Sequence, residues 1–170
     1  GRVGVRDLRT LTKLDEWDSH GIDPHQVVTD EEGHLFIANG GVFRTIPGDR
    51  KHSLERMDSS LVRLGSDGRL SGRWQLADRR LSLRHLAWSH DPARGDAWLG
   101  VALQAEHDDP AARATAPLLA VLDRGNLSLG SAPATMSLVA TSMGSGAGGH
   151  ISVENAKHNE KYWAERIDRI

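Results

Sequence analysis

Short runs in which apolar and polar residues alternate recur along most of this chain, and they predict β-strands. From Leu70 to Leu76, leucine and tryptophan side chains alternate with serine, arginine and glutamine, which is the period of two expected for a half-buried strand. Ser60–Leu64 is another such run, and Asp67-Gly68 lies between the two. Because Asp-Gly between alternating runs is a strong hairpin signal, these residues predict an antiparallel strand pair.

These strands belong to a unit that occurs twice. In the first copy, Gln26–Asp30 and Leu35–Asn39 flank a polar turn and are followed by the hairpin of Ser60–Leu76. In the second copy the corresponding strands are His85–Ser89, Ala97–Ala102, Pro117–Leu122 and Leu127–Gly130. Self-similarity of this kind is typical of propellers and solenoids, so the repeat indicates the fold class.

The repeat predicts an all-β protein, an incomplete β-propeller with about two full four-stranded antiparallel blades plus partial blades. Arg2–Trp17 is interpreted as the last two strands of a preceding blade, and Ser137–Thr141 and His150–Val153 as strands of a damaged third unit. The propeller domain is expected to span residues 1–153, and residues 154–170 to form a helical or disordered tail. Because blade stacking would stop at open edges, we expect the chain to self-associate.

Two segments lack a strand pattern and are interpreted as loops. Residues 40–58 contain glycine, proline and many charges, and residues 106–115 are polar. Long loops within a compact domain are often functional. Trp17 and Trp74 both fall in predicted fourth strands, where large aromatic side chains fill the gaps between blades, so we interpret them as core residues.

Composition narrows the classes of partner. Lys and Arg number 21 against 23 Asp and Glu, so the net charge is −2, which argues against nucleic acid or an anionic membrane surface as the partner. No run approaches the ~18 apolar residues of a membrane span, so no membrane insertion is expected, and no signal peptide is visible. The absence of cysteine excludes disulfides and thiolate metal sites, and it leaves the compartment undecided.

His25 and His85 take the same place in the two units, each where the first strand of its unit begins. If these strands are innermost, both imidazoles point at the propeller channel or its mouth, and imidazole is the commonest metal ligand. The pair is therefore a candidate transition-metal site, with Asp23 as a third ligand or simply as a turn residue. The alternative is structural: an imidazole that hydrogen-bonds a neighbouring blade's backbone and locks the strands together.

Asn39, Arg44 and Arg84 are further candidate ligand-binding residues. Asn39 precedes Gly40-Gly41, where glycine allows either the close approach of a ligand or a tight turn. Arg44 lies in the long loop among other cationic side chains that suit an anion, although a solvated loop explains the same charges. Arg84 directly precedes His85. The sequence offers no Gly-x-Ser-x-Gly elbow and no cysteine as a nucleophile, and we assign no catalytic residue.

The order of several short motifs is similar to that in the DUF1513 family of bacterial proteins, a family of unknown function with a predicted seven-bladed propeller fold. More loosely, the blades resemble YVTN-type propellers. The resemblance covers residues 1–153 and implies a secreted, usually periplasmic protein that is often encoded near iron-uptake components such as imelysin-like proteins. It implies no catalytic residues. The segments that carry it are Gly21–Gln26, Ala38–Val42, Leu54–Leu61 and Leu81–Ala87.

These observations favour a non-enzymatic propeller that acts as a binding or scaffold protein. Its partner is expected to be a protein or a small-molecule ligand, and the resemblance suggests a role in iron or other metal handling in the bacterial envelope. The alternative is a metal-binding protein or enzyme whose site lies at the channel mouth and is built on His25 and His85.

Overall fold

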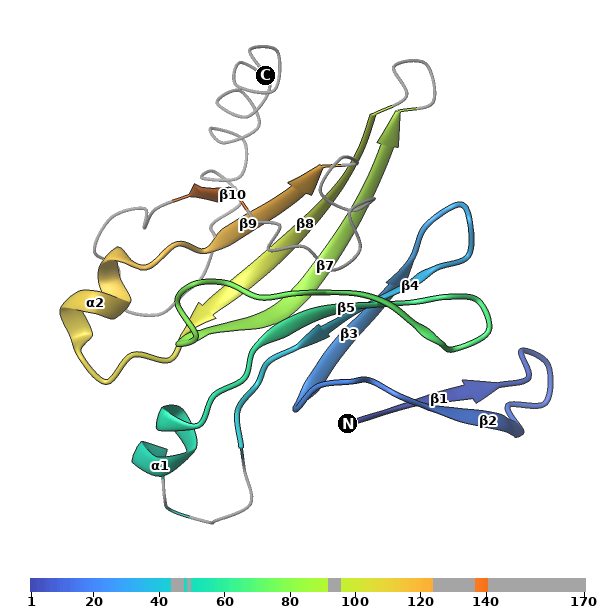
Figure 1. Cartoon of the computed structure of the whole chain (residues 1–170), viewed down its shortest axis with the longest axis horizontal. Coiled ribbons are helices and arrows are strands. Elements are labelled where there is room, and N and C mark those ends of the chain that lie inside the picture. The colour runs from blue at the N-terminus through green and yellow to red at the C-terminus, as the bar shows by residue number, and fades with distance from the viewer. Residues whose placement is uncertain (44–47, 49, 92–95, 124–136, 141–170) are drawn as a thin grey trace.

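The computed structural model describes residues 1–43, 48, 50–91, 96–123 and 137–140. Within these ranges almost all regular structure is antiparallel β-sheet (Figure 1), as the alternating pattern predicts. The strands are β1 (Arg2–Arg6), β2 (Lys13–Asp18), β3 (Pro24–Thr29), β4 (Leu35–Asn39), β5 (Ser60–Leu64), β6 (Leu70–Trp74), β7 (Leu81–Asp91), β8 (Asp96–Ala105), β9 (Leu119–Asp123) and β10 (Ser137–Ala140).

The first repeat unit forms a four-stranded sheet in the order β3-β4-β5-β6. The predicted bounds of β4 and β5 are confirmed, and the Asp67-Gly68 hairpin joins β5 to β6 as expected. Gly68 has a φ of +79° and lies under the ring of Trp17, which a Cβ atom would strike. Glycine at this turn therefore serves both the backbone conformation and the close packing of the tryptophan.

The second unit forms another four-stranded sheet in the order β10-β9-β8-β7. One prediction is wrong here: Ser137–Ala140 pairs with β9 as the outermost strand of this sheet and is not the second strand of a third unit. A short apolar run has no sequence mark that assigns it to a sheet, and here it pairs with the open edge of β9. The predicted strands at Leu127–Gly130 and His150–Val153, and the tail at residues 154–170, lie outside the described residues.

The two sheets pack on one another around a shared apolar core, and their first strands β3 and β7 are in contact. This confirms that the inner strands of the two units are neighbours. On the other face of the first sheet, Val3 and Trp17 from the β1–β2 hairpin cover a smaller cluster of Ile37, Val62 and Leu64. The stack is thus a hairpin, a first blade and a second blade, with tryptophans filling the space between layers as expected.

Both predicted loops contain a short helix, which is a correction to the sequence interpretation. The segment 40–58 includes α1 (Arg50–Glu55), in which Leu54 is buried, and Met57 is buried shortly after the helix. The segment 106–115 includes α2 (Pro110–Thr115), whose first turn is capped by the side chain of Asp109. An Asp immediately before Pro is a readable helix start, but six residues are too few to give a helical period.

One residue of the predicted β6 pattern also differs. Leu70 was expected on the same buried face as Trp74, but its side chain is exposed because β6 begins there, at the edge of the sheet.

Among the described residues, no helix is long and apolar enough to cross a membrane.

Candidate functional site

Each inner strand has one residue that stands outside the regular pairing with its neighbour. In β3 the register with β4 shifts between Pro24 and Gln26, which leaves His25 without an opposite residue. In β7 the register with β8 shifts between Leu83 and His85, which leaves Arg84 in the same situation. β-Bulges of this kind re-aim a side chain and often lie beside functional sites.

Because of the two bulges, the residues of the two units align differently from the prediction. His25 corresponds to Arg84, and Gln26 corresponds to His85, so His25 and His85 do not take the same place. A one-residue offset matters because successive side chains in a strand point to opposite faces. The contacts follow the corrected equivalence, since His25 meets Arg84 and Gln26 meets His85 across the line where β3 and β7 lie side by side. We call this line the β3–β7 seam.

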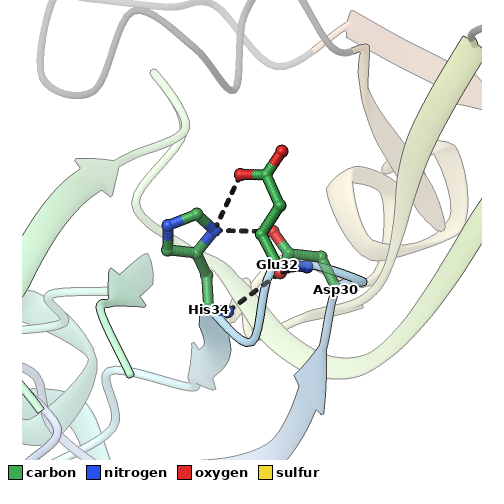
Figure 2. Close-up of side chains that lie close together, drawn as sticks. All are labelled: Asp30, Glu32 and His34. Carbon is green, nitrogen blue, oxygen red and sulfur yellow. Dashed lines mark hydrogen bonds and ion pairs between the residues drawn. The ribbon is translucent and has the colours of Figure 1, made fainter. Parts of the chain in front are cut away.

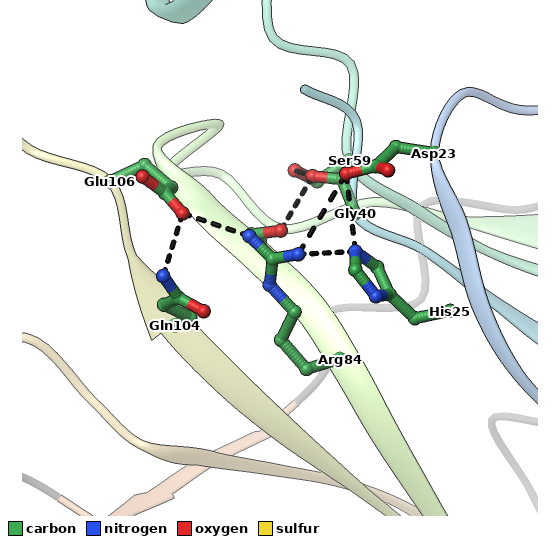
Figure 3. Close-up of polar contacts among 8 residues, drawn as sticks. Asp23, His25, Gly40, Ser59, Arg84, Gln104 and Glu106 are labelled. Atoms are coloured by element: carbon green, nitrogen blue, oxygen red, sulfur yellow. Dashed lines mark hydrogen bonds and ion pairs between the residues drawn. The ribbon is translucent and has the colours of Figure 1, made fainter. Parts of the chain in front are cut away.

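Arg84 is at the centre of a polar group at one end of the seam (Figure 3). Its Nη2 donates to Oε1 of Glu106 over 2.8 Å, and its Nη1 bonds Nε2 of His25 and lies 3.8 Å from Oδ2 of Asp23. Gln104 donates to the same Glu106 oxygen over 2.9 Å. Asp23, His25, Arg84, Gln104 and Glu106 are called the seam cluster below.

His25 has two neighbours of opposite charge at the same ring nitrogen. Its Nε2 contacts the guanidinium of Arg84 and lies 3.1 Å from Oδ2 of Asp23. The same carboxylate oxygen lies 3.8 Å from Nη1 of Arg84. The three side chains therefore form one connected polar group.

The backbone around Gly40 brings the seam cluster together. Asp23 has a φ of +57°, and its carbonyl accepts from the Gly40 amide over 2.8 Å. Ser59 and Ser82 both donate their hydroxyls to the Gly40 carbonyl over 2.8 Å, so the two blades share one acceptor. A Cβ on Gly40 would lie 2.8 Å from the His25 ring, and glycine is therefore required for this close approach.

The ion pair at the centre of the seam cluster is largely withdrawn from solvent. The side chains of Arg84 and Glu106 are 14% and 7% exposed. The carboxylates of Asp23 and Glu106 both face the guanidinium of Arg84. The buried Nε of Arg84 has no hydrogen-bond partner within the described part of the chain. Unsatisfied buried donors are uncommon in native proteins and need a reason, such as a ligand or water.

The remaining predicted site residues lie as follows. His85 is exposed, and its Nδ1 is 3.3 Å from Oε1 of Gln26, which also accepts from the Leu86 amide over 2.8 Å. Asn39 is fully buried and donates to the carbonyl of Ser19, while its Oδ1 has no hydrogen-bond partner within the described residues, so its ligand-binding role stays a prediction. Arg44 lies outside the described residues. A metal site on His25 and His85 stays a prediction; each imidazole contacts a side chain of the neighbouring blade, Arg84 and Gln26 respectively, and not its backbone as the structural alternative expected.

Sequence reasoning missed Gln26, Gln104 and Glu106. Glu106 follows directly after β8, and its backbone amide donates to the carbonyl of Arg80. Its position opposite Arg84 depends on the pairing of β7 with β8, which extends further along both strands than predicted. The pattern of apolar and polar residues within one strand does not show that Glu106, after β8, pairs with Arg84 in β7.

A second polar contact holds the opposite end of the seam. Oε1 of Glu31 accepts from Nε1 of Trp88 over 2.9 Å and lies 3.1 Å from Nδ1 of His90. The hydrogen bond from Trp88 is the main cause that lowers the pKa of Glu31 below its ordinary value. Polar side chains thus join the two blades at both ends of β3 and β7. His25 contacts Arg84 at one end, and Glu31 contacts Trp88 and His90 at the other.

Two stacked four-stranded antiparallel sheets with adjacent first strands, together with the hairpin on the first sheet, define an incomplete, propeller-like all-β protein. The chain belongs to the family described as Protein of unknown function (DUF1513), whose model matches residues 1–158. Neither the curated proteins nor the solved structures give a match to the chain.

Proposed function

We propose that this chain is a non-enzymatic binding or scaffold protein that uses the seam cluster to engage a protein partner or a small-molecule ligand. The observation that supports this is the position of the cluster, on the bulges of two neighbouring inner strands where the blades meet. Rigid strands hold these side chains more firmly than a loop would, and firm placement of a few polar groups is what a specific binding site needs.

Asp23 is the carboxylate of the seam cluster that lies closer to solvent, since its side chain is 18% exposed and that of Glu106 is 7% exposed. A polar group of a ligand or partner can therefore approach the seam cluster at Asp23.

The arrangement supports binding better than catalysis. A general base must be able to take a proton from a substrate that lies within hydrogen-bond reach. Nε2 of His25 already contacts Arg84 and Asp23, and Glu106 already accepts from Arg84 and Gln104. These groups satisfy one another, so their joint effect is to fix a charged surface.

We place this function in metal handling at the bacterial envelope, with the protein in the periplasm or secreted. Membership of the DUF1513 family supports the setting, because the resemblance implies a secreted protein encoded near iron-uptake components. The seam cluster is the candidate contact surface, and iron uptake is the property to measure.

The proposal is tested in the source bacterium by deletion of the gene and complementation with variants. Asp23→Asn is the most informative variant, because asparagine tolerates the left-handed backbone of residue 23 and removes only the charge. Loss of one charge-assisted contact should weaken ligand binding about tenfold. We expect the deletion strain to take up less radioactive iron under iron limitation, and the variant to restore uptake poorly.

Glu16→Gln is the matched control, since Glu16 is an exposed carboxylate on the β1–β2 hairpin, and it should complement like the unaltered gene. Thermal unfolding of purified Asp23→Asn protein must match that of the unaltered chain for the comparison to hold. Full complementation by Asp23→Asn would exclude the seam cluster as the contact surface. Unchanged iron uptake in the deletion strain would contradict the proposed setting.

A further inference from the structure

The turn between β3 and β4 brings three metal-ligating side chains together at the end of the seam opposite the seam cluster (Figure 2). Asp30, Glu32 and His34 each offer one ligand atom, and these atoms all lie within 4.8 Å of one another. In the described part of the chain this is the one group of three or more such side chains that converges in this way. We propose that it binds one divalent transition-metal ion.

The backbone of the turn preorganises the group. Oδ1 of Asp30 accepts from the amide of Glu32 over 3.0 Å and from the amide of His34 over 2.9 Å. Gly33 has a φ of +81°, which reverses the chain so that His34 returns over Asp30. Oδ1 of Asp30 therefore accepts the hydrogen bonds that shape the turn, and Oδ2 faces the imidazole of His34.

The spacing of the donor atoms suits a shared ion. Nδ1 of His34 lies 2.9 Å from Oδ2 of Asp30 and 3.6 Å from Oε2 of Glu32. Ligands held 2.0–2.2 Å from one tetrahedral or octahedral ion are about 3.0–3.5 Å apart. Without an ion, a hydrogen bond accounts for the shorter of the two distances, and the longer is that of an ion pair. The ion would take the place of the Nδ1 proton, and the neutral imidazole would carry its proton on Nε2.

The charge and ligand types also favour such an ion. Asp30 is 9% exposed at its side chain and Glu32 is 67% exposed, so one carboxylate is fixed and the other is free to adjust. Two carboxylates with one imidazole suit zinc, manganese or ferrous iron better than calcium or magnesium, which prefer oxygen ligands alone. Water molecules would fill the remaining coordination positions of the ion. Glu31, between the two carboxylates, is held by Trp88 and His90 and is not a ligand.

This site does not depend on the proposed function of the seam cluster. It lies at the other end of β3, and it involves neither His25 nor His85. A metal at the turn and a metal at the channel mouth therefore make different predictions for the same set of histidine variants.

The test is a calorimetric titration of the untagged full chain with Zn²⁺, repeated with Co²⁺ while the visible absorption is recorded. We expect one equivalent to bind. His34→Gln and Glu32→Gln, which alter partly exposed side chains, should each weaken binding at least about tenfold, the usual cost of losing one contribution to a metal site. Asp30→Asn keeps an acceptor for the turn and should also weaken binding. The nitrogen NMR shifts of His34 should change on addition of Zn²⁺.

His107→Gln serves as the control, because His107 pairs with Asp78 away from the turn, and it should bind Zn²⁺ like the unaltered chain. Circular dichroism confirms that each variant is folded. Failure of the unaltered chain to bind a stoichiometric ion would overturn the proposal, as would undiminished binding by folded His34→Gln protein. Loss of the ion in a His25→Gln/His85→Gln double variant, with retention in His34→Gln, would move the metal to the channel mouth.

Discussion

Replacing Trp74 with alanine should lower the free energy of unfolding by about 3–5 kcal/mol, the range for losing a large buried aromatic side chain. Trp74 is 2% exposed and belongs to the core shared by both blades. Its ring centroid lies 6.5 Å from that of Phe36, and the guanidinium of Arg63 lies 5.7 Å from the ring. The cavity would open in the core that both blades share. Urea denaturation followed by circular dichroism measures the change.

Leu70→Ala on the same strand is the matched control, because Leu70 is 47% exposed. We expect a change of about 0.5 kcal/mol or less there, as is usual for surface sites. Equal losses from the two substitutions would show that the inner face of β6 does not form the interface between the blades.

Arg84→Met should cost about 3 kcal/mol, since it takes the guanidinium away from the buried carboxylate of Glu106. Methionine keeps much of the apolar stem of the arginine, so the loss reports mainly on charge. Glu106, 7% exposed, would lose the 2.8 Å contact with Nη2 of Arg84 and keep the hydrogen bond from Gln104. The measurement is again urea denaturation at neutral pH.

Two further variants test whether the loss of stability in Arg84→Met comes from the buried charge. Arg69→Met removes an arginine whose side chain is 88% exposed, and this change should be nearly neutral because exposed ion pairs contribute little. Glu106→Gln in the Arg84→Met background should recover part of the lost stability, because it removes the buried charge that has lost its guanidinium. A loss below about 1 kcal/mol for Arg84→Met would indicate that solvent reaches Glu106 freely.

The repeat and most strand positions could be predicted from the sequence because each depends on local pattern. β4 and β5 have the expected bounds, since each is a short, mostly apolar and buried run that ends directly before a glycine. The burial of Trp74 follows from the same alternation. These features need only the period of a strand and the chemistry of a hairpin.

The seam cluster could not be predicted in the same way, because it depends on pairing between strands. Aligning His25 with His85 is natural from residue identity, but the bulges shift the true equivalence by one residue. A bulge is set by the partner strand and has no sequence signature in either strand alone. Glu106 reaches Arg84 for the same reason, through the full length of the β7–β8 pairing.

The central claim, that the two blades join with β3 against β7 in this register, is tested most directly at the amide of Leu86. This amide donates to the side chain of Gln26, across the seam, over 2.8 Å. Hydrogen exchange followed by NMR should find it protected in the unaltered chain and exposed in Gln26→Ala. The Val101 amide, in the fully buried centre of β8, should stay protected in both. Rapid exchange of Leu86 in the unaltered chain, or protection that survives Gln26→Ala, would contradict the proposed register of the blades.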